Sequence, residues 1–540
     1  MSADLSESLI AKSATASPWW KGAVIYQVYP RSFADSNGDG IGDLKGLTAR
    51  LDHVASLGCD GVWISPFFTS PMRDFGYDVA DYCGVDPIFG TLADFDALVE
   101  RAHGLGLKVM IDQVYSHSSD QHPWFVESRS SRDNPRADWY VWADPKADGS
   151  PPNNWQSVFG GPSWTWDARR EQYYHHNFLK EQPQLNLHNP AVQDALLDAA
   201  KFWLDRGVDG FRLDALNFAM HDPALTDNPP VENPARRSRP FDFQHHFHNQ
   251  GHPEIARFIE RVRALTDRYE AAFTVAEVGG ERAQAEMKLY TEGDGRLNSA
   301  YSFDYLYAET LTPEVVRGTI RNWPGAPGEG WPSWAFSNHD APRFASRWWD
   351  EANRDAGVRV ALMLLLSLRG NVILYQGEEL GLPQAHVPFE ALQDPEAIAN
   401  WPQTLGRDGA RTPLPWTDAA DGGFGSDRPW LPFDRAHRPY NVAAQREDAD
   451  SVLNWTRHLI AIRQANPALR EGSIRLLDEE SDQIVSFERE HDGERVACVF
   501  NLSGAAAENP VRSGAVLVSA GGAATTSPTL PPASGFIARC

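Results

Sequence analysis

The order of apolar segments along the chain constrains its fold more than any other feature. From residue 24 onward, short β-branched runs alternate with longer amphipathic segments. This alternation is typical of parallel strands joined by crossover helices. The strand-like runs are AVIYQVYP, GVWISPFF, LKVMID, VDGFRLD, AFTVAEV, YSFDYL, WAFSNHD and NVILYQG. Eight such runs interleaved with helices predict an α/β fold, the (β/α)8 or TIM barrel.

Two interruptions and one change of composition divide the chain further. Residues 113–185 are rich in Pro, Trp and Asn and too long for a plain connection, so they predict a small inserted domain after the third strand. The barrel is then expected at residues 1–112 and 186–450, with an irregular subdomain at about 383–440. From the run SVLNWTRHLIAIRQANP onward, alternating short apolar segments predict a linking helix and a C-terminal β-sandwich domain within residues 451–540.

The charge balance excludes several classes of partner. Lys and Arg total 49 against 73 Asp and Glu, which gives a net charge of -24. Such a chain repels phosphate backbones and anionic lipids, so neither nucleic acid nor a membrane is expected as a partner. The four cysteines form no CxxC pair, the amino terminus lacks a secretory signal, and no run is long enough to span a bilayer. We expect a cytoplasmic monomer or homodimer that binds a small molecule.

The stretch DSNGDGIGD at residues 35–43 has the spacing of oxygen ligands for a hard cation. Its oxygen-bearing side chains are those of Asp35, Asn37, Asp39 and Asp43. Gly46 stands where an EF-hand requires a bidentate Glu, and the residues before the loop read as a strand instead of a helix. The pattern leaves two possibilities, a cation site outside an EF-hand and an Asp/Gly-rich turn without an ion.

Acidic residues fall at the ends of predicted strands. They are Asp112, Asp214, Glu277 and Asp340. One such residue is often only a helix cap, but carboxyl ends of barrel strands converge on one mouth, where these carboxylates would repel and raise the pKa of at least one. Glycoside cleavage needs such a pair, a protonated acid beside an ionised carboxylate. Arg212, on the same strand face as Asp214, would either keep its neighbour ionised or form a structural ion pair.

Five motifs resemble the signature regions of glycoside hydrolase family 13, the α-amylase family. They are IDQVYSH, GFRLDALNF, VAEVGG, FSNHD and QPQLNLHNP. In addition, VIYQVYPRSFADSNGDGIGDLKG is similar to the amino-terminal block of the family's α-glucosidase and oligo-1,6-glucosidase branch. The resemblance covers about residues 19–480 in the family's order.

The resemblance implies roles for individual residues. Asp214 would be the nucleophile, Glu277 the acid and base, and Asp340 a stabiliser of the transition state. The implied sugar-binding residues are Asp74, Tyr77, His117, Phe159, Phe178, Arg212, His339 and Arg411. Arg411 is expected to pair with Asp74 and close the pocket, which implies exo-action. The resemblance also implies one structural Ca2+ or Mg2+ ion, held by Asp35, Asn37, Asp39, Asp43 and the carbonyl of Ile41, and no catalytic cofactor.

Departures from the family pattern refine the expectation. Ser116 and Gln184 replace ligands of the amylases' second metal, so that metal is not expected. Ala215 stands where relatives that prefer α-1,6 bonds tend to carry Val, which leaves room for an α-1,4-linked sugar. The sequence therefore predicts a retaining, exo-acting α-glucosidase for maltose-like or sucrose-like substrates, with some transglucosylation. Alternatives are a sucrose-acting transglucosidase or isomerase, an oligo-1,6-glucosidase, and a noncatalytic transporter subunit, which would show a membrane anchor and eroded carboxylates.

Overall fold

The structure, a computed structural model, describes residues 17–233, 239–323, 330–402, 404, 406–512 and 514–540. Residues 1–16 lie outside the described residues. Two predictions fall on them, the absence of a secretory signal and the start of the barrel domain. No described helix combines the length and the apolar character that crossing a bilayer requires.

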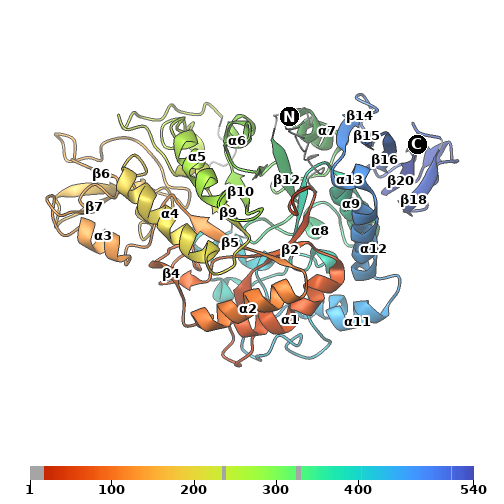
Figure 1. The fold of residues 1–540 in the computed structure, drawn as a ribbon, viewed down its shortest axis with the longest axis horizontal. Coiled ribbons are helices and arrows are strands. Elements are labelled where there is room, and N and C mark those ends of the chain that lie inside the picture. Colours follow the sequence, from red (N-terminus) through yellow and green to blue (C-terminus); the bar gives the residue numbers. More distant parts are fainter. Residues whose placement is uncertain (1–16, 234–238, 324–329, 403, 405, 513) are drawn as a thin grey trace, which may run out of the picture.

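Eight parallel strands of the described chain close into a barrel, in the order β1-β13-β12-β11-β10-β9-β5-β2 (Figure 1). Each overlaps one predicted run, so the predicted (β/α)8 barrel is confirmed. The strands are β1 (Val24–Val28), β2 (Gly61–Ile64), β5 (Lys108–Val114), β9 (Gly210–Asp214), β10 (Phe273–Val278), β11 (Ser299–Ser302), β12 (Trp331–Ala335) and β13 (Asn371–Tyr375).

Helices surround the barrel, and several of them begin at a side-chain cap. Asp43 caps the first helix by accepting from the N–H of Gly46, and Thr91 with Asp94 forms a capping box at the second. The longer helices are α1 (Leu44–Leu57), α2 (Leu92–Gly104), α4 (Pro190–Leu204), α5 (Ile255–Thr266), α6 (Ala283–Thr291), α7 (Pro313–Asn322), α9 (Arg354–Ser367) and α12 (Val452–Ala465). Shorter ones are α3 (Pro123–Ser128), α8 (Phe344–Arg347), α10 (Pro395–Ala399), α11 (Val442–Glu447) and α13 (Pro467–Arg470).

Two of the strand ends that differ from the prediction concern the predicted domain boundary and site residues. The third strand, β5, continues to Val114, so the expected domain boundary at residue 112 falls inside it. The seventh, β12, stops at Ala335, so His339 and Asp340 lie in the following loop and not at a strand end. The reason is a turn, because the side-chain oxygen of Asn338 accepts from the N–H groups of Asp340 and Ala341 at 2.9 and 2.7 Å.

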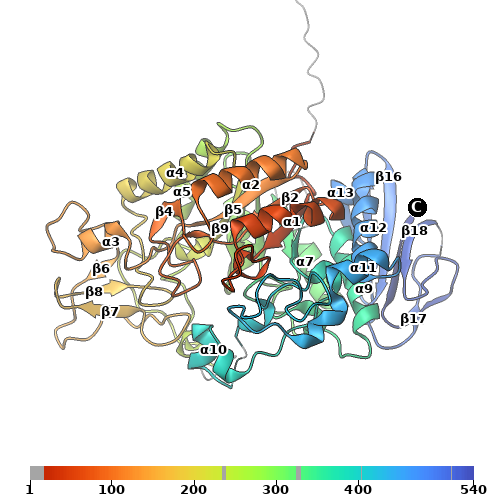
Figure 2. The same ribbon diagram turned by 90° about the horizontal axis from the view of Figure 1, so that it is seen from below.

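The segment between β5 and β9 carries a small sheet of its own. Strands β6 (Trp142–Ala143), β8 (Gln172–His175) and β7 (Trp164–Asp167) pair antiparallel in that order. A separate two-stranded ladder lies earlier in the chain, between β2 and α2, and pairs β3 (Phe68–Thr69) with β4 (Asp81–Val85). Figures 1 and 2 show the β6 to β8 sheet and the C-terminal sheet on opposite sides of the barrel.

The C-terminal part is all-β, as predicted. A five-stranded sheet has the order β14 (Ser473–Leu476), β15 (Ile484–His491), β16 (Glu494–Asn501), β20 (Ser534–Arg539), β18 (Ala515–Ala520), beside the pair β17 (Ala507–Glu508) and β19 (Thr529–Leu530). The sequence prediction missed β20 (SGFIAR), because the stretch before it, near residues 503–535, is rich in Ala, Gly, Ser and Pro and reads as loops. Buried Arg489 of β15 joins this sheet to the barrel by donating to the carbonyl of Ser367 at the end of α9.

The side chains inside the barrel are apolar along part of its length and polar or charged toward the carboxyl ends of the strands. One apolar cluster includes Ile25 of β1, Met110 of β5, Phe273 and Val275 of β10, and Ile373 of β13. Toward the carboxyl ends, the neighbouring strands instead place Asp112 beside Arg212 and Glu277 beside Tyr301. The apolar layer therefore supports a polar layer at one mouth of the barrel.

Candidate active site

Arg212 lies at the centre of this polar layer and is fully buried. Its Nη1 atom is 2.5 Å from Asp112 and 2.6 Å from Asp214, and its Nη2 atom is 2.6 Å from Glu277. The two terminal nitrogens of one guanidinium thus each contact one of the two carboxylates that the sequence assigns to catalysis. A planar guanidinium fixes such a pair more rigidly than a lysine ammonium could.

Neighbouring groups fix the orientation of Arg212 and of the carboxylates. Trp63 donates through Nε1 to the second oxygen of Asp112 at 2.7 Å. The hydroxyl of Tyr301 accepts from Arg212 Nε and donates to Glu277, both at 3.1 Å. The sequence prediction did not include Trp63 or Tyr301, which lie in apolar runs that read as core.

Burial and mutual repulsion affect the protonation of these carboxylates. Burial raises the pKa of Asp214 well above its usual value, the neighbouring carboxylates add to this, and Arg212 opposes them. Burial likewise raises the pKa of Asp112 to about 6, although Arg212 and Trp63 lower it. Asp214 and Asp112 therefore hold protons more strongly than isolated carboxyls do, in line with the raised pKa that the sequence predicted for at least one member.

The residue after Asp214 has a strained backbone. Ala215 lies in the left-handed region, with φ 40° and ψ 45°. In this conformation its N–H donates to Glu277 at 3.1 Å. A non-glycine residue held at positive φ costs roughly 1 to 3 kcal/mol and is typical of functional sites. This strained conformation places the N–H of Ala215 where it donates to Glu277, in addition to the hydroxyl of Tyr301.

Asp340 lies in a cationic surrounding. Arg411 Nη2 is 2.6 Å and Arg407 Nη1 is 3.4 Å from Asp340 Oδ1. Although burial alone would raise the pKa of Asp340, His339 and the guanidinium groups of Arg411 and Arg407 lower it below its usual value. Asp340 is therefore ionised at neutral pH.

The structure corrects the predicted partner of Asp74. Arg407, and not Arg411, contacts Asp74, at 2.8 Å from Nη2 to Oδ1. Arg407 also binds Asp394 through Nη2 and Nε at 2.9 and 3.0 Å. Both arginines occur in GRDGARTP, and the 3-10 helix at Asp408–Ala410 directs Arg411 instead to Asp340 and to the carbonyl of His339.

A tight turn brings Asp74 and Tyr77 into the site. Met72 and Phe75 both lie at positive φ, 60° and 51°, and Asp78 accepts from the N–H of Asp74 at 3.0 Å. Gln182, which the sequence prediction missed, donates to Asp74 at 3.1 Å and lies 3.1 Å from Nε2 of His117. Burial lowers the pKa of His117 to about 3, so its ring is neutral.

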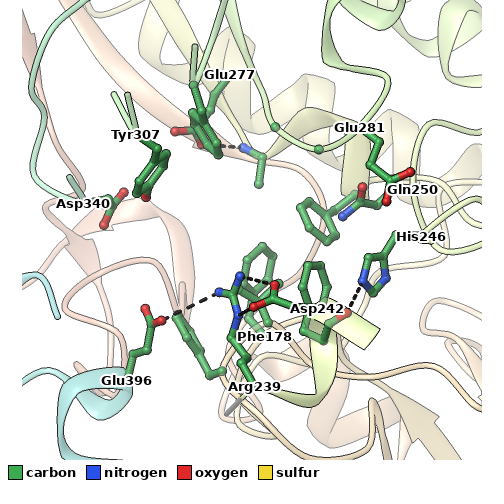
Figure 3. A pocket seen from close by; sticks show the side chains of 18 of the residues that line it. Phe178, Arg239, Asp242, His246, Gln250, Glu277, Glu281, Tyr307, Asp340 and Glu396 are labelled. Atoms are coloured by element: carbon green, nitrogen blue, oxygen red, sulfur yellow. Dashed lines mark hydrogen bonds and ion pairs between the residues drawn. The ribbon is translucent and has the colours of Figure 1, made fainter. Parts of the chain in front are cut away.

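A cavity of about 1230 Å³ opens above these groups. Most of the predicted catalytic and sugar-binding residues line it, namely Asp74, Tyr77, His117, Phe159, Phe178, Asp214, Glu277 and Asp340. Figure 3 shows Glu277 and Asp340 on its wall, with Phe178 behind the opening. Arg212, His339 and Arg411 were predicted to bind sugar, but they are buried behind this lining, where they hold Asp214, Tyr77 and Asp340. Their predicted contact with sugar stays a prediction.

The loop predicted to hold a cation is closed by its own hydrogen bonds. Asp35 accepts from the N–H groups of Asn37, Gly38 and Gly40, and Asp39 accepts from that of Ile41. Asp43 caps α1 and also accepts from Ser36. Among the described residues, no group of three or more acidic, His or Cys side chains is placed to hold a metal. The predicted donor set also includes the side chain of Asn37 and the carbonyl of Ile41, so these contacts do not test it, and the Ca2+ or Mg2+ ion stays a prediction.

Comparisons with known proteins agree with this geometry. The model of the alpha-amylase catalytic domain matches residues 27–472. A probable alpha-glucosidase of Rhizobium meliloti (strain 1021) is 55% identical over 498 residues, covering 91% of this chain and 90% of the relative. An oligo-1,6-glucosidase of Parageobacillus thermoglucosidasius is 36% identical over 517 residues, covering 90% of each chain.

Solved structures show the same fold. The alpha-glucosyl transfer enzyme XgtA superposes with a TM-score of 0.92 at 51% identity, covering 97% of this chain and 99% of XgtA. The trehalulose synthase MutB from Pseudomonas mesoacidophila MX-45 gives a TM-score of 0.88 at 33% identity, covering 97% and 99%. Fold and site together define a glycoside hydrolase on a (β/α)8 barrel. The chain belongs to the alpha-amylase family, glycoside hydrolase family 13, in its α-glucosidase and oligo-1,6-glucosidase branch.

The buried contacts of Arg407 predict a large loss of stability on its replacement. Arg407→Met would leave Asp74 and Asp394 without their cation in a buried setting, and we expect the free energy of unfolding to fall by about 3 to 5 kcal/mol. Arg206→Met, which removes a partly exposed ion pair with Asp96, should change it by no more than about 0.5 kcal/mol. Denaturant unfolding measures both. Equal effects of the two variants would contradict the prediction.

Proposed function

We propose that this enzyme is a retaining, exo-acting α-glucosidase that releases α-glucose from the nonreducing ends of short α-glucosides. The observation that carries the proposal is the shared guanidinium of Arg212, which holds Asp214 on one terminal nitrogen and Glu277 on the other. Such common anchoring is compatible with the short carboxyl separation, about 5 to 5.5 Å, that retention requires. The similarity to a probable alpha-glucosidase also supports it.

In the proposed reaction, Asp214 and Glu277 share the chemistry. Asp214 attacks the anomeric carbon and forms a covalent β-glucosyl ester, while protonated Glu277 gives its proton to the leaving oxygen. Glu277 then takes a proton from water, which hydrolyses the ester. Two inversions give net retention. Ionised Asp340, also on the cavity wall, accepts hydrogen bonds from the sugar hydroxyls and stabilises the positive charge of the transition state.

The pairing of Asp74 with Arg407 supports exo-action. Charge-assisted donors and acceptors at this end of the cavity, completed by Gln182, suit the hydroxyls of a terminal glucose unit. Phe159 and Phe178, whose ring centroids lie 6.0 Å apart, give the same region apolar walls. Arg407 takes the place in this proposal that the sequence assigned to Arg411.

The proposal also covers which sugar leaves and whether water or a second sugar takes up the glucose unit. We favour α-1,4-linked maltose-like substrates, and sucrose, because Ala215 presents only a methyl group beside the nucleophile. A sucrose-acting transglucosidase or isomerase is the second candidate. It is supported by the similarity to XgtA, an alpha-glucosyl transfer enzyme, and to MutB, solved in complex with sucrose.

Product analysis on four disaccharides tests the proposal. We expect free glucose as the main early product from maltose or sucrose, with lower kcat/KM on isomaltose and trehalose. Chromatography of the first products distinguishes hydrolysis from isomerisation. Isomaltose as the best of the four would contradict the argument from Ala215, and an isomeric disaccharide as the main product from sucrose would favour the second candidate.

Replacing Arg212 should move the acidic limb of the pH profile. Asp214 must be ionised to attack, so activity is present above its pKa and is lost as pH falls through that value. Arg212 lowers this pKa against burial, so Arg212→Gln raises it further, and the limb of kcat/KM should move up by about 1 to 3 pH units. The measurement is kcat/KM with 4-nitrophenyl α-glucoside between about pH 4 and 9, which brackets the interval of about pH 5 to 8 where proteins tend to be most stable. An unmoved limb in a folded variant would show that Arg212 does not control ionisation of the nucleophile.

A further inference from the structure

A second, smaller cavity lies apart from the active site. It has a volume of about 220 Å³ and shares no lining residue with the active-site cavity. Its walls come from α1, from the segment that holds Trp416 and Thr417, and from α11. None of its side chains takes part in the proposed cleavage of glycosides. The cavity is therefore a candidate for a separate binding site.

Two arginines of this lining have no anionic partner. Among the residues that the structure describes, neither Arg50 nor Arg446 forms an ion pair or a side-chain hydrogen bond. The guanidinium of Arg50 is placed by stacking on Trp416, 4.6 Å from the ring centroid. Burial lowers the pKa of Arg50, and the positive charge of Arg446 lowers it further, so the two cations repel each other. A bound anion would relieve this repulsion.

The carboxylate in the lining is already engaged elsewhere. Both oxygens of Asp52 accept from Nη2 of Arg101 on α2, at 2.8 and 2.7 Å. Its charge is therefore largely compensated by a cation outside the cavity. In a chain with a net charge of -24, Arg50 and Arg446 form a local excess of positive charge.

His53 adds a buried acceptor to this lining. Its side chain is 2% exposed, and its Nε2 atom is 2.9 Å from Glu379. Glu379 also accepts from the hydroxyl of Tyr26 and from the N–H of Gly377, both at 2.8 Å. A carboxylate with these donors fixes the proton of the neutral imidazole on Nε2, so Nδ1 carries the lone pair. Nδ1 is buried and has no hydrogen-bond partner among the described residues.

These groups together define the chemistry of a ligand. The two guanidinium groups donate to anionic oxygens, whereas Nδ1 of His53 requires a ligand that donates a proton. Hydrogen phosphate offers both, because it has anionic oxygens and one O–H group. Sulfate has the oxygens but no proton at neutral pH. A phosphate monoester has mostly lost its proton at pH 7.

We infer that this cavity binds hydrogen phosphate, with Arg50 and Arg446 donating to its oxygens and Nδ1 of His53 accepting from its O–H group. The site adds to the proposed α-glucosidase activity and does not depend on it. A phosphate held in this way joins α1 to α11 and stabilises the folded chain, because it binds the folded state alone.

Calorimetric titration of the full chain with sodium phosphate, at pH 7 and constant ionic strength, tests the inference. We expect one site with a Kd on the order of 1 mM, as suits two charge-assisted hydrogen bonds at a partly exposed site. Sulfate and glycerol 3-phosphate should bind about tenfold more weakly, because neither gives a proton to Nδ1. Sulfate that binds as tightly as phosphate would overturn the assignment of hydrogen phosphate.

Two variants and a matched control locate the site. Arg446→Gln and Arg50→Gln should each raise the Kd for phosphate about tenfold. Arg446 is exposed, so its variant keeps the test valid should Arg50→Gln fold poorly. Arg268→Gln is the control, because Arg268 is also an exposed arginine near the end of a helix, α5, but lies outside both cavities. We expect its Kd to equal that of the unchanged protein.

Two results would overturn the inference. One is the absence of saturable phosphate binding up to about 10 mM, ten times the expected Kd. The other is an equal Kd in Arg446→Gln and Arg268→Gln. Glucose release from maltose should be the same in Arg446→Gln as in the unchanged protein, because Arg446 lies outside the active-site cavity. A loss of that activity in the folded variant would contradict the separation of the two sites.

Discussion

The rest of the site depends on the burial of Arg212 among carboxylates at the carboxyl end of the barrel. A buried carboxylate without a partner costs several kcal/mol, so Asp112, Asp214 and Glu277 can be gathered here only because one guanidinium contacts all of them. Trp63, Tyr301 and the strained N–H of Ala215 supply the remaining donors. A second arrangement of the same kind, Arg407 and Arg411 with Asp74, Asp394 and Asp340, fixes the sugar-binding side.

Much of the fold could be predicted from the sequence, because it follows from local chemistry. Buried strands of a parallel barrel are continuous apolar runs, and helix starts such as Asp43 and Thr91 carry their caps in the sequence. The errors lie where tertiary context decides. Strand β20 is the short run SGFIAR, which follows a stretch rich in Ala, Gly, Ser and Pro and is recognised as a strand only by its pairing with β16 and β18. Strand β12 ends early because the side chain of Asn338 forms a turn.

The candidate site was predictable in its acidic members and less so in its cations. Asp214 and Glu277 stand at strand ends in motifs, but the choice between Arg407 and Arg411 depends on the turn of a short 3-10 helix that no spacing rule fixes. The bound Ca2+ or Mg2+ ion, the cytoplasmic location and the monomeric or dimeric state stay predictions.

The stereochemistry of the first product tests the central claim most directly. If Asp214 and Glu277, held on one guanidinium, act as nucleophile and acid, the bond at the anomeric carbon is inverted twice. Proton NMR of maltose hydrolysis, recorded before the released sugar mutarotates, should then show α-glucose as the first product from the nonreducing end. β-Glucose appearing first from that end would mean direct attack by water and would contradict the account.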